Sequence, residues 1–175
     1  MTKHILVATD GSDTAMRAVD LAAEIAAKFE VPLTVAHAIH FGRPPEELAR
    51  MAEVEHLVDR AKARAPVDFP NVPDTMLGLF SDTRPEGDSM RLVTMIGEEI
   101  MERAADRARE LGAETVDTRS VVDDPAEGIL SIAENVGADM IVIGHRGLGR
   151  LKRVVLGSVA QKVLSHAECS VMAVR

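Results

Sequence analysis

Residues 4–38 read HILVATDGSDTAMRAVDLAAEIAAKFEVPLTVAHA, and this stretch decides the fold. It begins with a nearly continuous apolar run, His4 to Thr9, which ends at the turn residues Asp10, Gly11 and Ser12. Such a run is typical of a strand buried on both faces of a parallel sheet. A second apolar run covers residues 33–38. The stretch therefore predicts two strands joined by a helix, the unit from which parallel sheets are built.

The segment between these strands has the pattern of an amphipathic helix. Ser12 or Asp13 can cap its start, because their side-chain oxygens accept hydrogen bonds from the free N–H groups of a first turn. Apolar residues then recur every three or four positions, which places them on one helix face: Ala15, Ala18, Val19, Ala22, Ala26 and Phe29. We expect this face, Phe29 included, to pack on the sheet.

The same alternation returns in the second half of the chain. Helices are predicted over about 89–111, 125–136 and 159–166, and strands over 115–122, 138–144 and 169–174. At the middle helix Asp124 can be the N-cap, and Glu127 can complete a capping box with it. Five strands alternating with four helices predict a doubly wound α/β domain whose parallel sheet has helices on both faces.

Residues 41–88 interrupt this alternation and are predicted to form an insertion between the second strand and the second helix. Residues 46–65 have an amphipathic helical pattern, and an acidic, proline-rich stretch follows. Two interpretations stay open for its apolar residues Met76, Leu77, Leu79 and Phe80: a lid or partner surface, or a segment that packs on its own domain. The length of 175 residues favours one domain, 1–175.

Composition excludes several classes of function. A net charge of −8 repels nucleic acid, and four Phe with no Trp or Tyr leave no stacking platform for single strands. No apolar run approaches the roughly 18 residues of a membrane span, and no signal-peptide pattern precedes the first strand. Cys169 is the single cysteine, so neither an internal disulfide nor a CxxC zinc site is possible. We expect a cytoplasmic protein that binds neither nucleic acid nor membrane.

The loop after the strand at 138–144 is the strongest candidate for a ligand site. Gly144, Gly147 and Gly149 allow the main chain to approach a ligand closely. Gly157-Ser158 opens a helix, whose free N–H groups and dipole attract an anion. Open parallel sheets bind ligands at the carboxyl ends of their strands. The loop therefore predicts a phosphate site.

Positive charge is concentrated in the same segment. From Gly144 onward the only acidic residue is Glu168, against six basic residues: Arg146, Arg150, Lys152, Arg153, Lys162 and Arg175. In an acidic protein the positive charge is thus concentrated where the glycines are, which favours a phosphate ligand. His145 is either a further phosphate contact or an exposed histidine without a partner. The other five histidines and Cys169 are expected to serve packing, and no metal-ligand spacing or catalytic triad is present.

Three separated segments resemble the ATP-binding universal stress proteins. Gly144-x2-Gly147-x9-Gly157-Ser158 matches their nucleotide-binding signature, and residues 5–12 and 169–175 are similar to the two ends of the family. The resemblance implies a Rossmann-like, adenine-nucleotide alpha-hydrolase-like fold with strand order 3-2-1-4-5. It also implies a homodimer formed by antiparallel pairing of the last strand, 169–174.

The same resemblance implies ATP in the crevice of the sheet. By position, Thr9 and Asp10 would lie beside the adenosine, the main chain of Ala38 would meet the adenine edge, and Gly144 would lie near the ribose. The phosphates would be held by the loop and the helix that follows it: Gly147, Gly157, Ser158 and Val159, with His145, Arg146 and Gly149 as further candidates. Any Mg²⁺ or Mn²⁺ would be held by the phosphates of ATP.

No residue pattern aligns a general base with the γ-phosphate, so no catalytic residue is predicted. The leading hypothesis is a nucleotide-dependent regulatory module that acts through a protein partner. The alternative is a slow nucleotide hydrolase or nucleotidyl-transfer enzyme on the same fold. A third is a scaffold without nucleotide affinity that works through its dimer edge and insertion.

Overall fold

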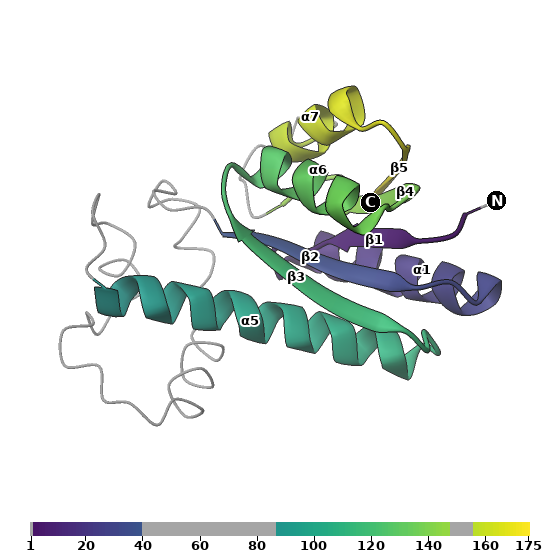
Figure 1. Ribbon diagram of the computed structural model, residues 1–175, viewed down its shortest axis with the longest axis horizontal. Coiled ribbons are helices and arrows are strands. Elements are labelled where there is room, and N and C mark those ends of the chain that lie inside the picture. The colour runs from purple at the N-terminus through teal and green to yellow at the C-terminus, as the bar shows by residue number, and fades with distance from the viewer. Residues whose placement is uncertain (1, 40–86, 148–155) are drawn as a thin grey trace.

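The structure, a computed structural model, describes residues 2–39, 87–147 and 156–175 (Figure 1). Of the insertion predicted at 41–88, residues 41–86 lie outside these ranges. Gly149 also lies outside them. The elements run in the order β1 (Ile5–Ala8), α1 (Asp13–Phe29), β2 (Leu33–Ile39), α5 (Gly87–Glu110), β3 (Val116–Val122), α6 (Pro125–Val136), β4 (Met140–Gly144), α7 (Ser158–His166) and β5 (Ser170–Val174). The predicted alternation of strands and helices is confirmed, with element ends that differ from the predictions by two residues or fewer. None of these helices has the length and apolar composition needed to cross a bilayer.

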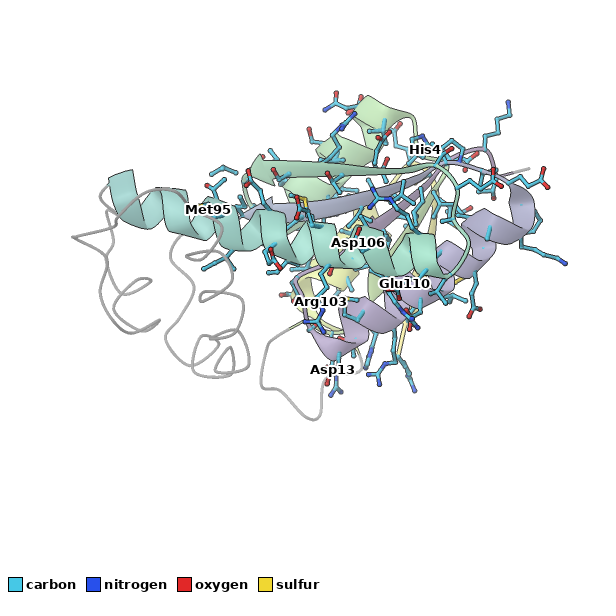
Figure 2. The ribbon with its side chains drawn as sticks, turned by 90° about the horizontal axis from the view of Figure 1, so that it is seen from below. His4, Asp13, Met95, Arg103, Asp106 and Glu110 are labelled. Carbon is cyan, nitrogen blue, oxygen red and sulfur yellow. The ribbon has the colours of Figure 1, made fainter. Side chains whose placement is uncertain are left out.

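The strands form one parallel sheet in the order β3-β2-β1-β4-β5, which confirms the predicted topology. One face packs against α1 and α5, and the other against α6 and α7 (Figure 1). Figure 2 views the molecule from the side that α1 and α5 cover. The chain leaves β1 toward β2 and β3 and then crosses back to β4. The switch point, where open parallel sheets bind ligands, therefore lies between the carboxyl ends of β1 and β4.

Helix α1 packs through small residues, as its pattern predicts. Its N-cap is Ser12, whose hydroxyl accepts a hydrogen bond from the Ala15 N–H (3.3 Å). The predicted apolar face is buried from Ala15 to Ala26. The prediction for Phe29 is wrong, because its side chain is 57% exposed. Phe29 is the last residue of α1 and lies beyond the last buried position of the helix.

At the start of α6, the predicted cap by Asp124 is present, but the predicted capping contact of Glu127 is not. The Asp124 carboxylate accepts hydrogen bonds from the N–H groups of Ala126 and Glu127. Glu127 does not complete the capping box, because Asp123 Oδ1 accepts the Asp124 N–H (2.7 Å). The Glu127 carboxylate instead lies 2.8 Å from Lys162 Nζ of α7, which is also 3.2 Å from Asp124. Lys162 therefore ties α7 to α6.

The Asp124 cap leads to a pH-dependent prediction. The backbone hydrogen bond from Glu127, followed by the Lys162 ammonium, lowers the pKa of Asp124 from its usual value. A lowered folded-state pKa adds stability that is fully present above the unfolded pKa and is lost as the pH falls through the folded one. We expect Asp124→Ala to lower the free energy of unfolding by about 1 kcal/mol at neutral pH. The deficit should shrink as the pH falls below about 4, as measured by urea unfolding.

Asp124→Asn is the matched control, since asparagine caps as well as aspartate but carries no charge. At neutral pH its stability should lie between those of the alanine variant and the wild type, because it keeps the cap but loses the charge that pairs with Lys162. A loss as large as that of the alanine variant would assign the stabilisation to the ion pair with Lys162 and contradict a capping role.

Candidate functional site

The loops after β1 and β4 meet at the switch point. A Cβ atom added at Gly147 would lie 2.5 Å from Asp10 Oδ2, so the backbone of the second loop lies directly against the carboxylate of the first. The carboxylate is oriented by the Ser12 N–H, which donates to Asp10 Oδ1 (3.0 Å). A residue larger than glycine would therefore displace the Asp10 carboxylate. Two segments far apart in sequence form one wall of the site.

Helix α7 starts beside the same point. Its N-cap, Gly157, donates its N–H to His145 O (2.7 Å), and a Cβ atom added there would lie 3.9 Å from Gly147 N. The cap provides no side-chain acceptor for the first turn. The N–H groups of Ser158 and Val159 belong to that turn, which has no intrahelical acceptors. They can therefore bind an anion.

Gly144 packs against another element of the fold. The sequence predicted only that it would lie near a ribose. A Cβ atom there would lie 2.9 Å from the Thr14 carbonyl carbon and 3.0 Å from Ala15 N. The end of β4 thus rests on the first turn of α1. The Thr14 hydroxyl adds a hydrogen bond to Arg146 O. Thr14 was not singled out from the sequence, because its partner is 132 residues away and no local pattern marks it.

His145 faces the end of β5. Its main-chain N–H donates to Val174 O (2.6 Å), and Nδ1 of its ring lies 3.0 Å from the same oxygen. Because a carbonyl oxygen only accepts, this contact requires the proton on Nδ1. The half-buried ring is thus partnered, and the expectation of an exposed histidine without a partner is wrong. A phosphate contact through Nε2 stays a prediction.

The carboxyl end of β2 provides a second wall. Thr9 N–H donates to Ala36 O (2.9 Å) on the β1 side, whereas Ile39 O accepts from Asp123 N–H (3.2 Å) on the β3 side. Successive residues of a strand direct their main-chain polar groups to alternate sides. The N–H and C=O of Ala38 therefore point to the β1 side, at a level where β1 has ended. This is where the resemblance places the edge of an adenine ring.

Two of the remaining candidate groups pack as expected, and one does not: His166 is exposed at the end of α7, with its Nδ1 2.8 Å from Lys162 O, so the packing role expected for it is wrong. Cys169 is partly buried against the α6–α7 face, and burial, followed by the charge of Asp139, raises the pKa of its thiol. His4 Nε2 lies 2.8 Å from Thr34 Oγ1. In the described ranges, no three His, Cys, Asp or Glu side chains come together as metal ligands.

These features define a class of protein, the doubly wound α/β domains with a glycine loop and a helix start at the switch point. The model of the universal stress protein family matches residues 1–175, and the chain belongs to this family. It is 31% identical over 175 residues to universal stress protein YxiE of Bacillus subtilis (strain 168), with 100% of both chains covered.

Two solved structures are similar to this one. A universal stress protein crystallised in complex with cAMP has 26% sequence identity and a TM-score of 0.59, with 99% of this chain and 97% of that chain covered. UspA from Lactobacillus plantarum has 20% identity and a TM-score of 0.66, with 99% and 98% covered, and shows the likeness of the fold.

Proposed function

We propose that this chain binds ATP at the carboxyl ends of β1 and β4 and acts in the cytoplasm as a nucleotide-dependent regulatory module in stress response. One observation carries the proposal: Asp10, Gly147 and Gly157 meet at one point. A carboxylate that can accept ribose hydroxyls thereby stands beside a glycine backbone and a helix start that can donate to phosphates. Family membership and the related protein crystallised with cAMP support an adenine nucleotide as the ligand.

The residues present fit such a ligand. The Ser158 hydroxyl and the N–H groups of Ser158 and Val159 would hold the phosphates. Gly157 would leave space for the phosphates but would not donate a hydrogen bond to them, because its own N–H is bonded to His145 O. Ala38 would meet the base with its main chain. A magnesium or manganese ion would enter with the phosphates, which are its preferred ligands.

A regulatory role is supported by where the loop is anchored. The Arg146 carbonyl accepts a hydrogen bond from Thr14 of α1, and the neighbouring His145 is bonded to the end of β5. A ligand that orders this loop would therefore bias two elements outside the site. A protein partner would recognise the surface that changes.

The edge strand β5 is the proposed homodimer interface. It pairs with β4 on one side, and no strand of the described ranges pairs with its other side. Ser170 and Ala173 are exposed on it. Edges with unpaired main-chain groups and apolar side chains are usually covered in native proteins. Antiparallel pairing with β5 of a second copy would cover this one.

The test is to denature the freshly purified protein and identify the released small molecules by chromatography and mass spectrometry. We expect intact ATP from the wild type and none from a variant that combines Gly157→Asp with Ser158→Ala. Release of ADP or AMP would favour the slow hydrolase instead. No released nucleotide, together with no rise of the melting temperature on adding ATP, would overturn the proposal. Light scattering of the same sample checks the dimer, which a mass of 18.8 kDa would contradict.

A further inference from the structure

We propose that His37 is a positioning residue of this site, whose ring holds the carbonyl of Thr9 and thereby leaves the main-chain N–H of Ala38 to the adenine base. The inference deepens the proposed function and rests on it. His37 lies near the end of β2, is 8% exposed, and has its Nδ1 2.8 Å from Thr9 O. The sequence predicted only a packing role for it.

The hydrogen-bond ladder between β1 and β2 shows what the ring replaces. Ala8 is paired with Ala36, and the Thr9 N–H donates to Ala36 O (2.9 Å). In a regular parallel ladder the next bond would run from the Ala38 N–H to Thr9 O. Thr9 O instead accepts a hydrogen bond from the His37 ring. A side chain thus donates to the carbonyl that would accept from the Ala38 N–H in a regular ladder.

The same contact fixes the turn that carries Asp10. Since the Thr9 carbonyl can only accept, His37 must carry its proton on Nδ1. The carbonyl belongs to the planar peptide group between Thr9 and Asp10. Holding this group in place also orients the start of the turn from which the Asp10 carboxylate extends. One ring therefore acts on both the base side and the ribose side of the proposed site.

Helix α5 holds the ring from the opposite side. A Cβ atom added at Gly97 would lie 2.9 Å from His37 Cδ2 and 3.3 Å from its Nε2. The helix backbone therefore passes directly over the imidazole, and only glycine leaves room for it. The helix backbone therefore blocks rotation of the ring toward α5. This packing makes His37 a fixed donor.

The test compares three variants that differ in where they place a donor. Asparagine can place its amide nitrogen close to the position of Nδ1, glutamine close to that of Nε2, and leucine offers no donor. The ligands are ATP and GTP, which share ribose and triphosphate. Guanine presents an N1–H donor where adenine presents an acceptor, so only ATP can use the Ala38 N–H. Affinities are measured by calorimetry, and circular dichroism checks the fold.

We expect the wild type to prefer ATP over GTP. His37→Leu and His37→Gln should lower this preference about tenfold, the worth of one hydrogen bond, and His37→Asn should retain it. An equal loss for both nucleotides, no loss, or no rescue by asparagine would overturn the role of His37. If the wild type binds neither nucleotide, the proposed function fails. Nitrogen-15 NMR of the ligand-free protein then tests His37 alone, and an Nε2–H tautomer would overturn the contact.

Discussion

A Gly157→Asp variant is expected to lose ATP affinity by about 100-fold or more while folding at least as well as the wild type. The two effects have opposite signs because the carboxylate would stand at the N-cap of α7. Gly157 has φ −70° and ψ 156°, a backbone conformation that suits a capping aspartate. A cap there would stabilise the helix by a few tenths of a kcal/mol. It would also occupy the N–H groups that are proposed to bind phosphate, and its charge would repel the phosphate.

Calorimetry with ATP and thermal unfolding without ligand measure the two effects. Gly157→Asn is the matched control, since it adds nearly the same volume and a capping oxygen without the charge. It should lose less affinity than the aspartate variant. Unchanged ATP affinity in Gly157→Asp would show that phosphates do not bind at the start of α7. A lowered melting temperature would show that Gly157 is needed for the fold.

Gly144→Ala is expected to lower the free energy of unfolding by about 2 kcal/mol, the range for overpacked positions. The added methyl group would lie 2.9 Å and 3.0 Å from backbone atoms of Thr14 and Ala15. Backbone atoms in the first turn of α1 cannot rotate away as a flexible side chain can. The melting temperature should fall by about 4–8 °C, as measured by calorimetry.

Gly137→Ala separates this steric effect from the general cost of replacing a glycine. Gly137 has φ +66°, and a Cβ atom added there would have no heavy atom within 4 Å. Its replacement should cost about 1 kcal/mol of backbone strain alone. Equal losses in the two variants would contradict a close approach of β4 to α1 as the reason for glycine at position 144.

Local pattern was sufficient to predict most of the fold. The apolar run before Asp10 and the alanine repeat after Ser12 each depend on neighbours within one strand or one helix. The cap at Asp124 likewise depends on N–H groups two and three residues away. The glycines of the β4 loop indicated the candidate site for a similar reason, because close backbone approach restricts the residue type itself. Patterns of this kind depend only on residues that are close together in the sequence.

Contacts between distant residues could not be predicted in this way. The bond from Thr14 to Arg146 and the placing of His145 against Val174 follow from the packing of α1 and β5 beside the loop. Lys162 was counted among the basic residues near the glycine loop, and the sequence did not show that its partners are two carboxylates of α6. His37 looked like an ordinary core residue, because only the paired strands show which carbonyl it meets.

The central place of β1 has a consequence for how the candidate site forms during folding. Ile5 is paired with Leu33 on one side and with Met140 on the other. The entropy lost on closing a chain loop increases with its length, and distant pairings slow folding. A partly folded chain can therefore join β1 to β2 while the junction with β4 is still open. Because the crevice exists only once that junction has closed, a bound nucleotide would stabilise the completed sheet and none of its precursors.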